Sequence, residues 1–381
     1  MARRTLVAAL AACLALAACG GDDSPDDGTA PERPEPLLGV TSGALFDPAA
    51  PLGAEVRAMA ASGVTTLRVP FYWWTAQPYR GAADVPAGER KDFADVEGRP
   101  TSFAATDPIV AAAARARIAL LPTVLGAPSW AARHPELRNS PPKGNEAYAA
   151  FMRALIGRYG PDGSFWSEHP DIPKQALREW QLWNEPDHLH YWSDQPYARD
   201  YVELARAARD AIKDADPDAR VVMGGFADRS WESIETVYAA GAKGVFDVVA
   251  IHPYTFEVRN VLRIVRLARR ALRDAGDADR PLWLTEITWS SGKRPGHKPA
   301  PFETTPQDQA ARLAQAVPLL IRTRDELGVE RIFWENWISK DSNHDNAFDF
   351  SGLRVLGPDG SVSEKPAFAE FKRIALGLQG D

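Results

Sequence analysis

The sequence predicts a single domain with the (β/α)8 TIM-barrel fold, and two observations lead to this prediction. From Leu37 onward, short apolar segments of β-strand composition alternate with amphipathic helical segments, and no second linker interrupts the alternation. The strand pattern recurs eight times in about 340 residues, which matches the repeat number of this barrel.

Eight segments have the composition expected of barrel strands. Several are apolar along nearly their whole length, as expected when a parallel sheet is covered on both faces. In chain order, the expected strands are Leu37–Thr41, Thr65–Pro70, Ile118–Thr123, Glu179–Asn184, Arg220–Gly224, Phe246–His252, Pro281–Glu286 and Arg331–Asn336.

Helical segments with one apolar face lie between these strands, and one more closes the chain. The expected helices are Ala54–Ser62, Asp107–Arg117, Asn145–Tyr159, Tyr197–Ala215, Ser230–Ala240, Val258–Ala275, Pro306–Leu327 and Pro366–Leu376. An open, doubly wound sheet would show the same alternation. That fold commonly has a Gly-rich phosphate-binding loop after its first strand, and no such loop is present here. The Gly224-Gly225 pair follows a later strand and lacks the remaining glycines of that motif.

The composition is that of an ordinary globular protein. Of 381 residues, 45% are hydrophobic and 25% are charged, which excludes global disorder. The formal net charge is −7 and no run of Lys and Arg occurs, so nucleic acid is not an expected partner.

Residues 1–18 have the features of a lipoprotein-type signal peptide. Arg3 and Arg4 precede an apolar run, Leu6–Ala18, that is too short to remain in a bilayer as an anchor. The run ends in Leu-Ala-Ala-Cys, which resembles the bacterial lipobox and implies lipidation of Cys19. We therefore expect an exported protein, anchored by lipid to the outer face of the bacterial cell membrane. The alternative is an ordinary secretory signal, which would give a periplasmic or secreted protein.

A disordered tether is expected between the lipidated residue and the folded domain. Residues 20–36 contain no large apolar side chain and are dominated by Pro, Gly and acidic residues. The expected organisation is therefore a signal peptide at 1–18, a lipidated cysteine and tether at 19–36, and one (β/α)8 domain at 37–381.

Tryptophan is concentrated at the ends of the expected strands. In a TIM barrel the chemistry is located where strands end and the following loops begin. Trp and Tyr rings pack against the C–H faces of sugars, so this concentration predicts a carbohydrate pocket, although any single ring could instead belong to the interior. Eight of the twelve Trp residues lie at this predicted rim: Trp73, Trp74, Trp130, Trp183, Trp192, Trp289, Trp334 and Trp337.

Two glutamates, Glu185 and Glu286, end the fourth and seventh expected strands. Each follows apolar and aromatic residues, where burying a carboxyl group is costly unless the group serves a purpose. Either one alone would be an ordinary surface or salt-bridge residue. Two carboxyl groups that flank one pocket are the arrangement that glycoside hydrolysis requires, so the pair favours catalysis.

These residues carry a family resemblance. The segments Trp183-Asn184-Glu185-Pro186 and Leu284-Thr285-Glu286, with the His-x-Tyr at 252–254, resemble the clan A glycoside hydrolases. They are most similar to the family 39 type, which includes β-xylosidases, iduronidases and exopolysaccharide hydrolases. The similarity extends from Leu37 to about Leu376.

The resemblance implies a retaining glycosidase that cleaves an oligo- or polysaccharide by double displacement. Glu185 corresponds to the acid/base and Glu286 to the nucleophile. A covalent mechanism of this kind requires the two carboxyl groups to lie about 5–5.5 Å apart, whereas inverting enzymes keep them about 6.5–9.5 Å apart.

The resemblance also implies substrate-binding roles. Asn184 is implied to bind the sugar 2-hydroxyl, and Arg68 to keep the nucleophile ionised through its charge. His252 and Tyr254 are implied to orient the nucleophile and to line the sugar pocket.

Aromatic residues are expected to complete the pocket. Trp334 or Trp337 matches the aromatic floor contributed by the eighth strand, and Trp130 and Trp289 follow other strand ends. Glu335 lies between the two floor candidates and adds a third carboxyl group, which we expect to face the surrounding helices and to be paired there.

No cofactor and no metal ion are expected, and the expected partners are a carbohydrate and, through the lipid anchor, a membrane. Two alternatives remain open from the sequence. The first is a sugar-binding lipoprotein receptor without catalysis, and the second is a transglycosidase that remodels a surface polysaccharide with the same two carboxylates.

Overall fold

The computed structural model describes residues 37–294, 300 and 302–379. The signal peptide, Cys19 and the tether all lie outside these residues, so their assignment stays a prediction. Among the described residues, no helix combines the length and the apolarity needed to span a bilayer.

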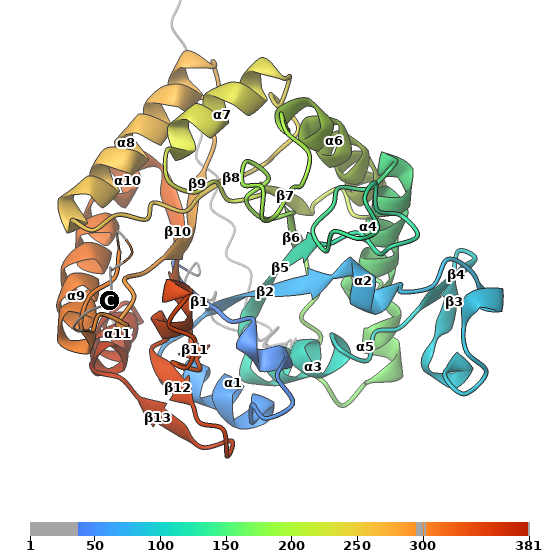
Figure 1. The fold of residues 1–381 in the computed structure, drawn as a ribbon, viewed down its shortest axis with the longest axis horizontal. Coiled ribbons are helices and arrows are strands. Elements are labelled where there is room, and N and C mark those ends of the chain that lie inside the picture. The colour runs from blue at the N-terminus through green and yellow to red at the C-terminus, as the bar shows by residue number, and fades with distance from the viewer. Residues whose placement is uncertain (1–36, 295–299, 301, 380–381) are drawn as a thin grey trace, which may run out of the picture. The chain divides into compact units, whose positions relative to one another are not determined.

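All eight expected barrel strands are present and form one parallel sheet (Figure 1). Along the sheet the order is β7-β6-β5-β2-β1-β10-β9-β8. The bounds are β1 (Leu38–Thr41), β2 (Thr66–Tyr72), β5 (Ala119–Leu125), β6 (Glu179–Leu182), β7 (Arg220–Met223), β8 (Val249–Ile251), β9 (Leu282–Ile287) and β10 (Val329–Glu335).

The two edges of this sheet meet and close the barrel. Parallel bridges join Val222 to Val248 and Phe226 to Ile251, which connects the β7 edge to the β8 edge. The amide of Met223 donates to the carbonyl of Val248 at 2.9 Å across the same seam. The TIM-barrel prediction is therefore confirmed, and the open, doubly wound alternative is excluded.

Helices surround the barrel (Figure 1). They are α1 (Leu52–Ala61), α2 (Trp73–Ala76), α3 (Asp107–Ala116), α4 (Asn145–Tyr159), α5 (Ser164–Glu168), α6 (Ala198–Ala215), α7 (Ser230–Ala239), α8 (Val258–Asp274), α9 (Pro306–Arg322), α10 (Arg324–Leu327) and α11 (Pro366–Gly377). The expected helix Pro306–Leu327 is divided in two, because the chain leaves the helix at Thr323 and α10 ends in the left-handed Gly328, with φ of 60°.

Amphipathic patterning explains how the long helices pack. In α8 the apolar positions recur every three or four residues and are buried against the barrel, whereas the arginines between them are mostly exposed. The buried residues are Val261, Leu262, Ile264, Val265, Ala268, Ala271 and Leu272.

Two smaller sheets lie outside the barrel sheet. The antiparallel strands β3 (Ala94–Val96) and β4 (Arg99–Thr101) form a hairpin in the connection between β2 and α3. The strands β11 (Ile338–Ser339), β12 (Arg354–Leu356) and β13 (Val362–Glu364) form a three-stranded sheet that follows β10.

The barrel interior is layered, and the layering positions the site. An apolar layer consists of Leu121, Val222, Val248, Ala250, Trp283 and Phe333, all buried. Because successive strand residues point to opposite faces, the next inward position lies two residues further along each strand. Four of those positions carry polar side chains: Thr123, His252, Thr285 and Glu335.

Candidate active site

Arg68 on β2 organises the polar end of the barrel. Its guanidinium donates from Nη1 to Glu286, from Nη2 to Asn184 Oδ1 and from Nε to Gln181 Oε1, each at 2.6 Å. The Arg68 side chain is only 4% exposed. One buried cation therefore holds residues from β6 and β9 in fixed positions around it.

Glu286 on β9 is held as a carboxylate. Arg68 donates to its Oε1, and the Tyr254 hydroxyl donates to its Oε2. Burial alone would raise the pKa of Glu286. The charges of His252 and Arg68, with the hydrogen bonds from Tyr254 and Arg68, outweigh burial and lower the pKa below its usual value.

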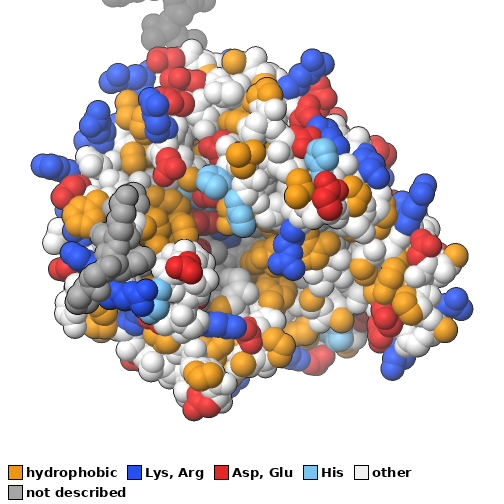
Figure 2. Space-filling view, viewed as in Figure 1, with side chains coloured by type: hydrophobic (Ala, Val, Ile, Leu, Met, Phe, Trp, Pro, Cys, Tyr) orange, Lys and Arg blue, Asp and Glu red, His pale blue; other side chains and the backbone are white. Residues whose placement is uncertain are grey.

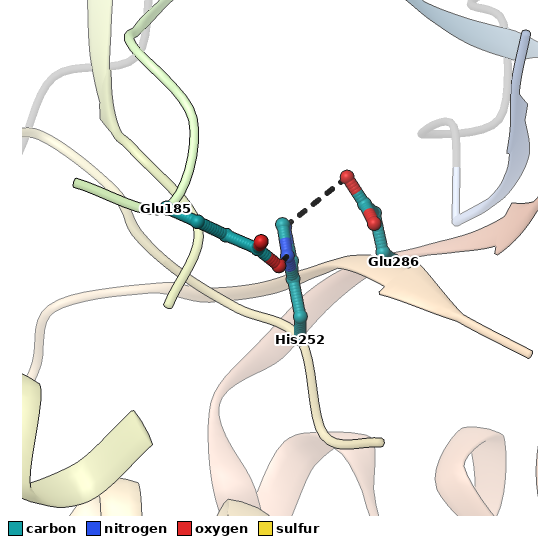
Figure 3. Close-up of side chains that lie close together, drawn as sticks. All are labelled: Glu185, His252 and Glu286. Carbon is teal, nitrogen blue, oxygen red and sulfur yellow. Dashed lines mark hydrogen bonds and ion pairs between the residues drawn. The ribbon is translucent and has the colours of Figure 1, made fainter. Parts of the chain in front are cut away.

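Glu185 lies on the opposite side of the same imidazole (Figure 3). Nδ1 of His252 lies 2.6 Å from Glu185 Oε1, and Nε2 lies 3.0 Å from Thr285 Oγ1 and 3.7 Å from Glu286 Oε1. His252 is fully buried. The imidazole therefore lies between the two glutamates and restricts the direction of both carboxyl groups.

The two glutamates lie close together. One carboxylate oxygen of Glu185, one of Glu286 and a ring nitrogen of His252 all lie within 4.8 Å of one another. Their side chains are 11% and 12% exposed, so both retain a small accessible edge.

The same three groups are potential metal ligands, but their surroundings do not suit a cation. Both oxygens of Glu286 already accept hydrogen bonds from Arg68 and Tyr254. The guanidinium is positively charged and lies 2.6 Å from the carboxylate, so an added cation would be repelled. The donor set therefore fits hydrogen-bonded catalysis better than metal binding.

The chain leaves β6 earlier than expected, and this departure aims the site residues. β6 ends at Leu182, and Trp183 and Glu185 take positive φ values of 67° and 39°. The indole of Trp183 donates to the Tyr191 carbonyl at 2.6 Å, which holds the following loop. As a result Asn184 meets Arg68 while Glu185 meets His252.

Two polar residues below the site were not identified from the sequence. Gln181 accepts hydrogen bonds from Arg68 and from Thr123 Oγ1 at 2.9 Å, and it donates to the Met223 carbonyl at 3.0 Å. Thr285 contacts His252. The available signal was a polar residue at an inward position of an otherwise apolar strand.

Gly225 is a third residue whose role the sequence did not reveal. A Cβ at this position would lie 1.9 Å from His252 Nε2, so the imidazole occupies the space that any side chain would need. The Gly225 carbonyl also accepts from the Glu185 amide at 3.0 Å. The Gly224-Gly225 pair thus serves close packing under the site.

Most of the predicted rim tryptophans are buried, and the expectation that they face a sugar is corrected for three site candidates. Trp289, Trp334 and Trp337 are at most 1% exposed. Their indole nitrogens donate to the Phe256 carbonyl, the Ser351 carbonyl and Glu55. Rings this large gain most by packing between barrel and helices, so these three offer no face to a ligand.

Two other aromatic residues remain partly exposed. Trp130 donates to the Gln77 carbonyl at 2.8 Å, and the Arg99 guanidinium covers one face of its ring at 4.2 Å from the centroid. Trp74 stacks on Tyr72 with centroids 4.6 Å apart. Figure 2 shows a recess near the middle of this face of the molecule, with histidine and Lys or Arg side chains at its edge.

Glu335 faces the site and not the helices, which corrects the expectation from the sequence. Burial and the charge of Glu286 raise the pKa of Glu335 well above its usual value, and the charge of Glu185 adds to this; Arg68 and a hydrogen bond from Thr41 act in the opposite direction. The two-residue period places Glu335 inward, above Phe333. The pocket therefore contains three carboxyl groups.

Asp187 lies just beyond the acid/base candidate. Its Oδ2 accepts from the Ser233 hydroxyl at 2.6 Å. Burial raises the pKa of Asp187 to about 6, with the charge of Glu185 adding to the increase and the Ser233 hydrogen bond opposing it.

Comparison with known proteins supports the fold. No protein-family model matches the chain, and no curated protein sequence is significantly similar to it. Many solved structures share its fold. A glucosidase from Croceicoccus marinus is 18% identical with a TM-score of 0.61, and the match covers 90% of this chain and 68% of that one.

Two further matches are glycoside hydrolases by their printed descriptions. A family 39 glycoside hydrolase from Bacteroides cellulosilyticus WH2 is 21% identical with a TM-score of 0.59, over 91% of this chain and 64% of that one. A monomeric β-xylosidase from Caulobacter crescentus CB15 is 17% identical with a TM-score of 0.59, over 89% and 67%. The present chain thus spans about two thirds of these proteins, and at such identities what they share is the barrel fold that the resemblance implied.

Proposed function

We propose that this protein is a retaining glycosidase that acts on an oligo- or polysaccharide. The observation that carries the proposal is the ionised Glu286, held by Arg68 and Tyr254, beside a second carboxyl group on His252. The 4.8 Å limit on the distance between an oxygen of Glu185 and an oxygen of Glu286 favours the covalent geometry over the wider inverting one.

In the first step, Glu286 Oε attacks the anomeric carbon while Glu185 donates a proton to the departing glycosidic oxygen. The bond to the aglycone breaks as an ester bond to Glu286 forms. Arg68 and Tyr254 hold the nucleophile so that it meets the sugar from a single direction. Asn184, fixed by Arg68, is placed to bind a hydroxyl of the same sugar.

In the second step, Glu185 accepts a proton from water, and the resulting hydroxide displaces Glu286 from the anomeric carbon. The neighbouring imidazole of His252, 2.6 Å away, keeps the carboxyl group of Glu185 aimed at the same point in both steps. Two inversions give net retention. If another sugar replaces water, the same residues perform transglycosylation, and product analysis distinguishes the two outcomes.

The free-energy cost of burying these carboxyl groups favours catalysis over simple sugar binding. A binding protein needs hydrogen-bonding groups, but it gains nothing from burying three carboxyl groups in one pocket. The matched glucosidase, xylosidase and family 39 structures are consistent with the same proposal.

Removal of each carboxyl group tests the proposal. Glu286→Gln should abolish turnover of every aryl glycoside, because no covalent intermediate can form. Glu185→Ala should lower kcat by about 10²–10⁴-fold on substrates whose leaving group needs a proton, and should spare the first step on activated substrates. Added azide should restore turnover of Glu185→Ala and give a glycosyl azide of retained configuration.

The opposite pattern would exchange the two roles. If azide rescued Glu286→Ala with a retained product while Glu185→Ala stayed inactive on activated substrates, Glu185 would be the nucleophile. If neither substitution lowered turnover, the glycosidase proposal itself would be wrong.

A further inference from the structure

Glu335 is the one carboxyl group of the pocket to which the proposed mechanism gives no task. It ends β10, where its backbone pairs with Thr41 of β1. The charge of Glu286 raises the pKa of Glu335, and Glu335 in its ionised form would raise the pKa of three tyrosines from separate parts of the chain: Tyr72, Tyr191 and Tyr254. Glu335 therefore lies in the middle of the pocket.

The carboxyl group of Glu335 lacks a full set of partners. Its Oε2 is shielded from solvent and has no hydrogen-bond partner among the described residues, and the same holds for Oδ1 of the adjacent Asn336. The Glu335 side chain as a whole is only partly buried, so another part of it still borders the pocket. The terminal torsion of a glutamate is broad and nearly two-fold, so a half turn exchanges its two oxygens.

The surroundings of Glu335 favour an uncharged carboxyl group. His252, Arg68 and Tyr254 favour the ionised form of Glu286, which acts electrostatically on Glu335, so a second negative charge is opposed. A protonated carboxyl group is a hydrogen-bond donor as well as an acceptor. A buried donor without a partner is costly, so a site that keeps one needs an explanation, such as a role in catalysis or binding.

We propose that Glu335, as a neutral carboxylic acid, donates a hydrogen bond to an oxygen of the sugar bound against Glu286 and selects substrates that carry that oxygen. This proposal rests on the glycosidase function above. The substrate class it names is a sugar whose ring hydroxyl reaches the end of β10. A deoxy sugar at that position leaves the carboxyl group unpaired and is rejected.

Two substitutions of Glu335 separate hydrogen bonding from charge and from packing. Glu335→Gln keeps the size and a donor, and should stay within about fivefold of the wild-type kcat/KM. Glu335→Leu keeps a similar size without polar atoms. It should lower kcat/KM by about 10–100-fold, mainly by raising KM. The substrate is whichever of 4-nitrophenyl β-D-glucoside, β-D-xyloside and β-D-galactoside the wild-type protein turns over fastest.

Monodeoxy analogues of that substrate identify the oxygen. For one analogue, the kcat/KM of the wild-type protein should fall as much as the kcat/KM for the parent substrate falls in Glu335→Leu. On this analogue, Glu335→Leu should lower kcat/KM no further. The same substitutions at the exposed Glu326, 65% accessible, are the control and should change neither kcat nor KM.

Measurements of the melting temperature and of covalent labelling distinguish failure of the Glu335 proposal from failure of the glycosidase proposal. Glu335→Leu should keep or raise the melting temperature, because it removes an unpaired buried polar atom. A 2-deoxy-2-fluoro aryl glycoside should still label Glu286 in both variants. Loss of labelling in the wild-type protein would contradict the glycosidase proposal alone.

Three results would overturn the role of Glu335 while the glycosidase stands. They are full activity of Glu335→Leu, equal losses on every deoxy analogue, and equal destabilisation of the Gln and Leu variants. The last result would show that Glu335 is structural.

Discussion

Contacts with His252, Arg68 and Tyr254 distinguish two carboxyl groups of the pocket. The charges of His252 and Arg68, with the hydrogen bonds from Tyr254 and Arg68, lower the pKa of Glu286 despite burial, whereas burial and the charge of Glu286 raise the pKa of Glu335. These neighbours therefore favour the ionised form of Glu286 and the neutral form of Glu335. This is the pattern by which one pocket keeps a carboxylate and a carboxylic acid at the same pH.

Asp187 makes stability depend on pH. Its pKa is raised to about 6 from 3.8, so the folded state binds its proton more tightly than the unfolded state. The stabilisation is complete below about pH 4 and is lost as the pH rises through about 6, by at most about 3 kcal/mol. Asp187→Asn should flatten the dependence of unfolding free energy on pH in this window, as measured by urea unfolding between pH 4 and pH 7.

The control for Asp187 is the same change at an exposed aspartate. Asp162→Asn should leave the pH profile of the unfolding free energy as it is in the wild-type protein. Parallel profiles for the Asp187 variant and the wild-type protein would show that Asp187 does not titrate in this range.

At the scale of the elements, the close packing of Gly225, shortly after β7, against the residue after β8 fixes the position of His252, which contacts Glu185. Gly225→Ala would place a methyl group within 1.9 Å of His252 Nε2, so the imidazole must move away from Glu185 and Thr285. We expect a loss of about 10²-fold in kcat, since displacements near 1 Å have such effects. The free energy of unfolding should fall by about 1–3 kcal/mol. Enzyme assays and thermal unfolding measure the two effects.

Gly157→Ala in α4 is the matched control, because nothing lies within 4 Å of the added Cβ. It should leave kcat unchanged and stabilise the helix by about 0.5–1 kcal/mol. Wild-type turnover by Gly225→Ala would show that the position of His252 is not critical.

The sequence predicted elements best where local signals bracket them. Helix α4 has the expected bounds, since Gly144 and Gly160 flank a clear amphipathic run. The strand was expected to extend to Asn184, but β6 ends at Leu182. The positive φ of Trp183 depends on its contact with Tyr191, which no local pattern reveals. Contacts of this kind cannot be predicted from the local sequence pattern.

The candidate site was predicted in the same uneven way. Arg68, Glu185, His252, Tyr254 and Glu286 do meet in the structure, because strand ends of one barrel converge wherever the strands are identified. The burial of the rim tryptophans could not be predicted, since it depends on helices that pack from outside. The inward direction of Glu335 follows from the two-residue period of a strand once Phe333 is known to point inward.

For the whole molecule, the number of strands and the lack of a Gly-rich loop after the first strand together predicted the architecture. Eight strands of this length close into a barrel whose interior is filled by side chains, and the bridges between β7 and β8 complete that closure. Pairing between β1 and β10, which lie almost 300 residues apart in the chain, follows from closure and not from any local signal.

Export and anchoring remain a proposal about residues outside the described part of the chain. If Cys19 is lipidated, the mature protein should be found in the membrane fraction, and Cys19→Ser should be soluble or remain an uncleaved precursor. Fractionation with mass spectrometry of the N-terminus measures this. Wild-type protein that is wholly soluble and begins at Gly20 or later would establish simple secretion.

The burial of the tryptophans gives the molecule a selective optical signal. Of the twelve indoles, only Trp74, Trp130 and Trp231 are more than about a tenth exposed, so emission should be blue-shifted and weakly quenched by acrylamide. Trp74 stacks on Tyr72; burial and the charge of Glu335 raise the pKa of Tyr72, while the charges of Arg138 and Arg68 oppose the increase, so this stacked pair lies near the charged groups of the site. A sugar that enters the pocket should therefore change the fluorescence of this one indole. Trp74→Phe should remove the ligand-dependent change in a titration, whereas Trp231→Phe should preserve it, and an unchanged response from Trp74→Phe would place the reporter elsewhere.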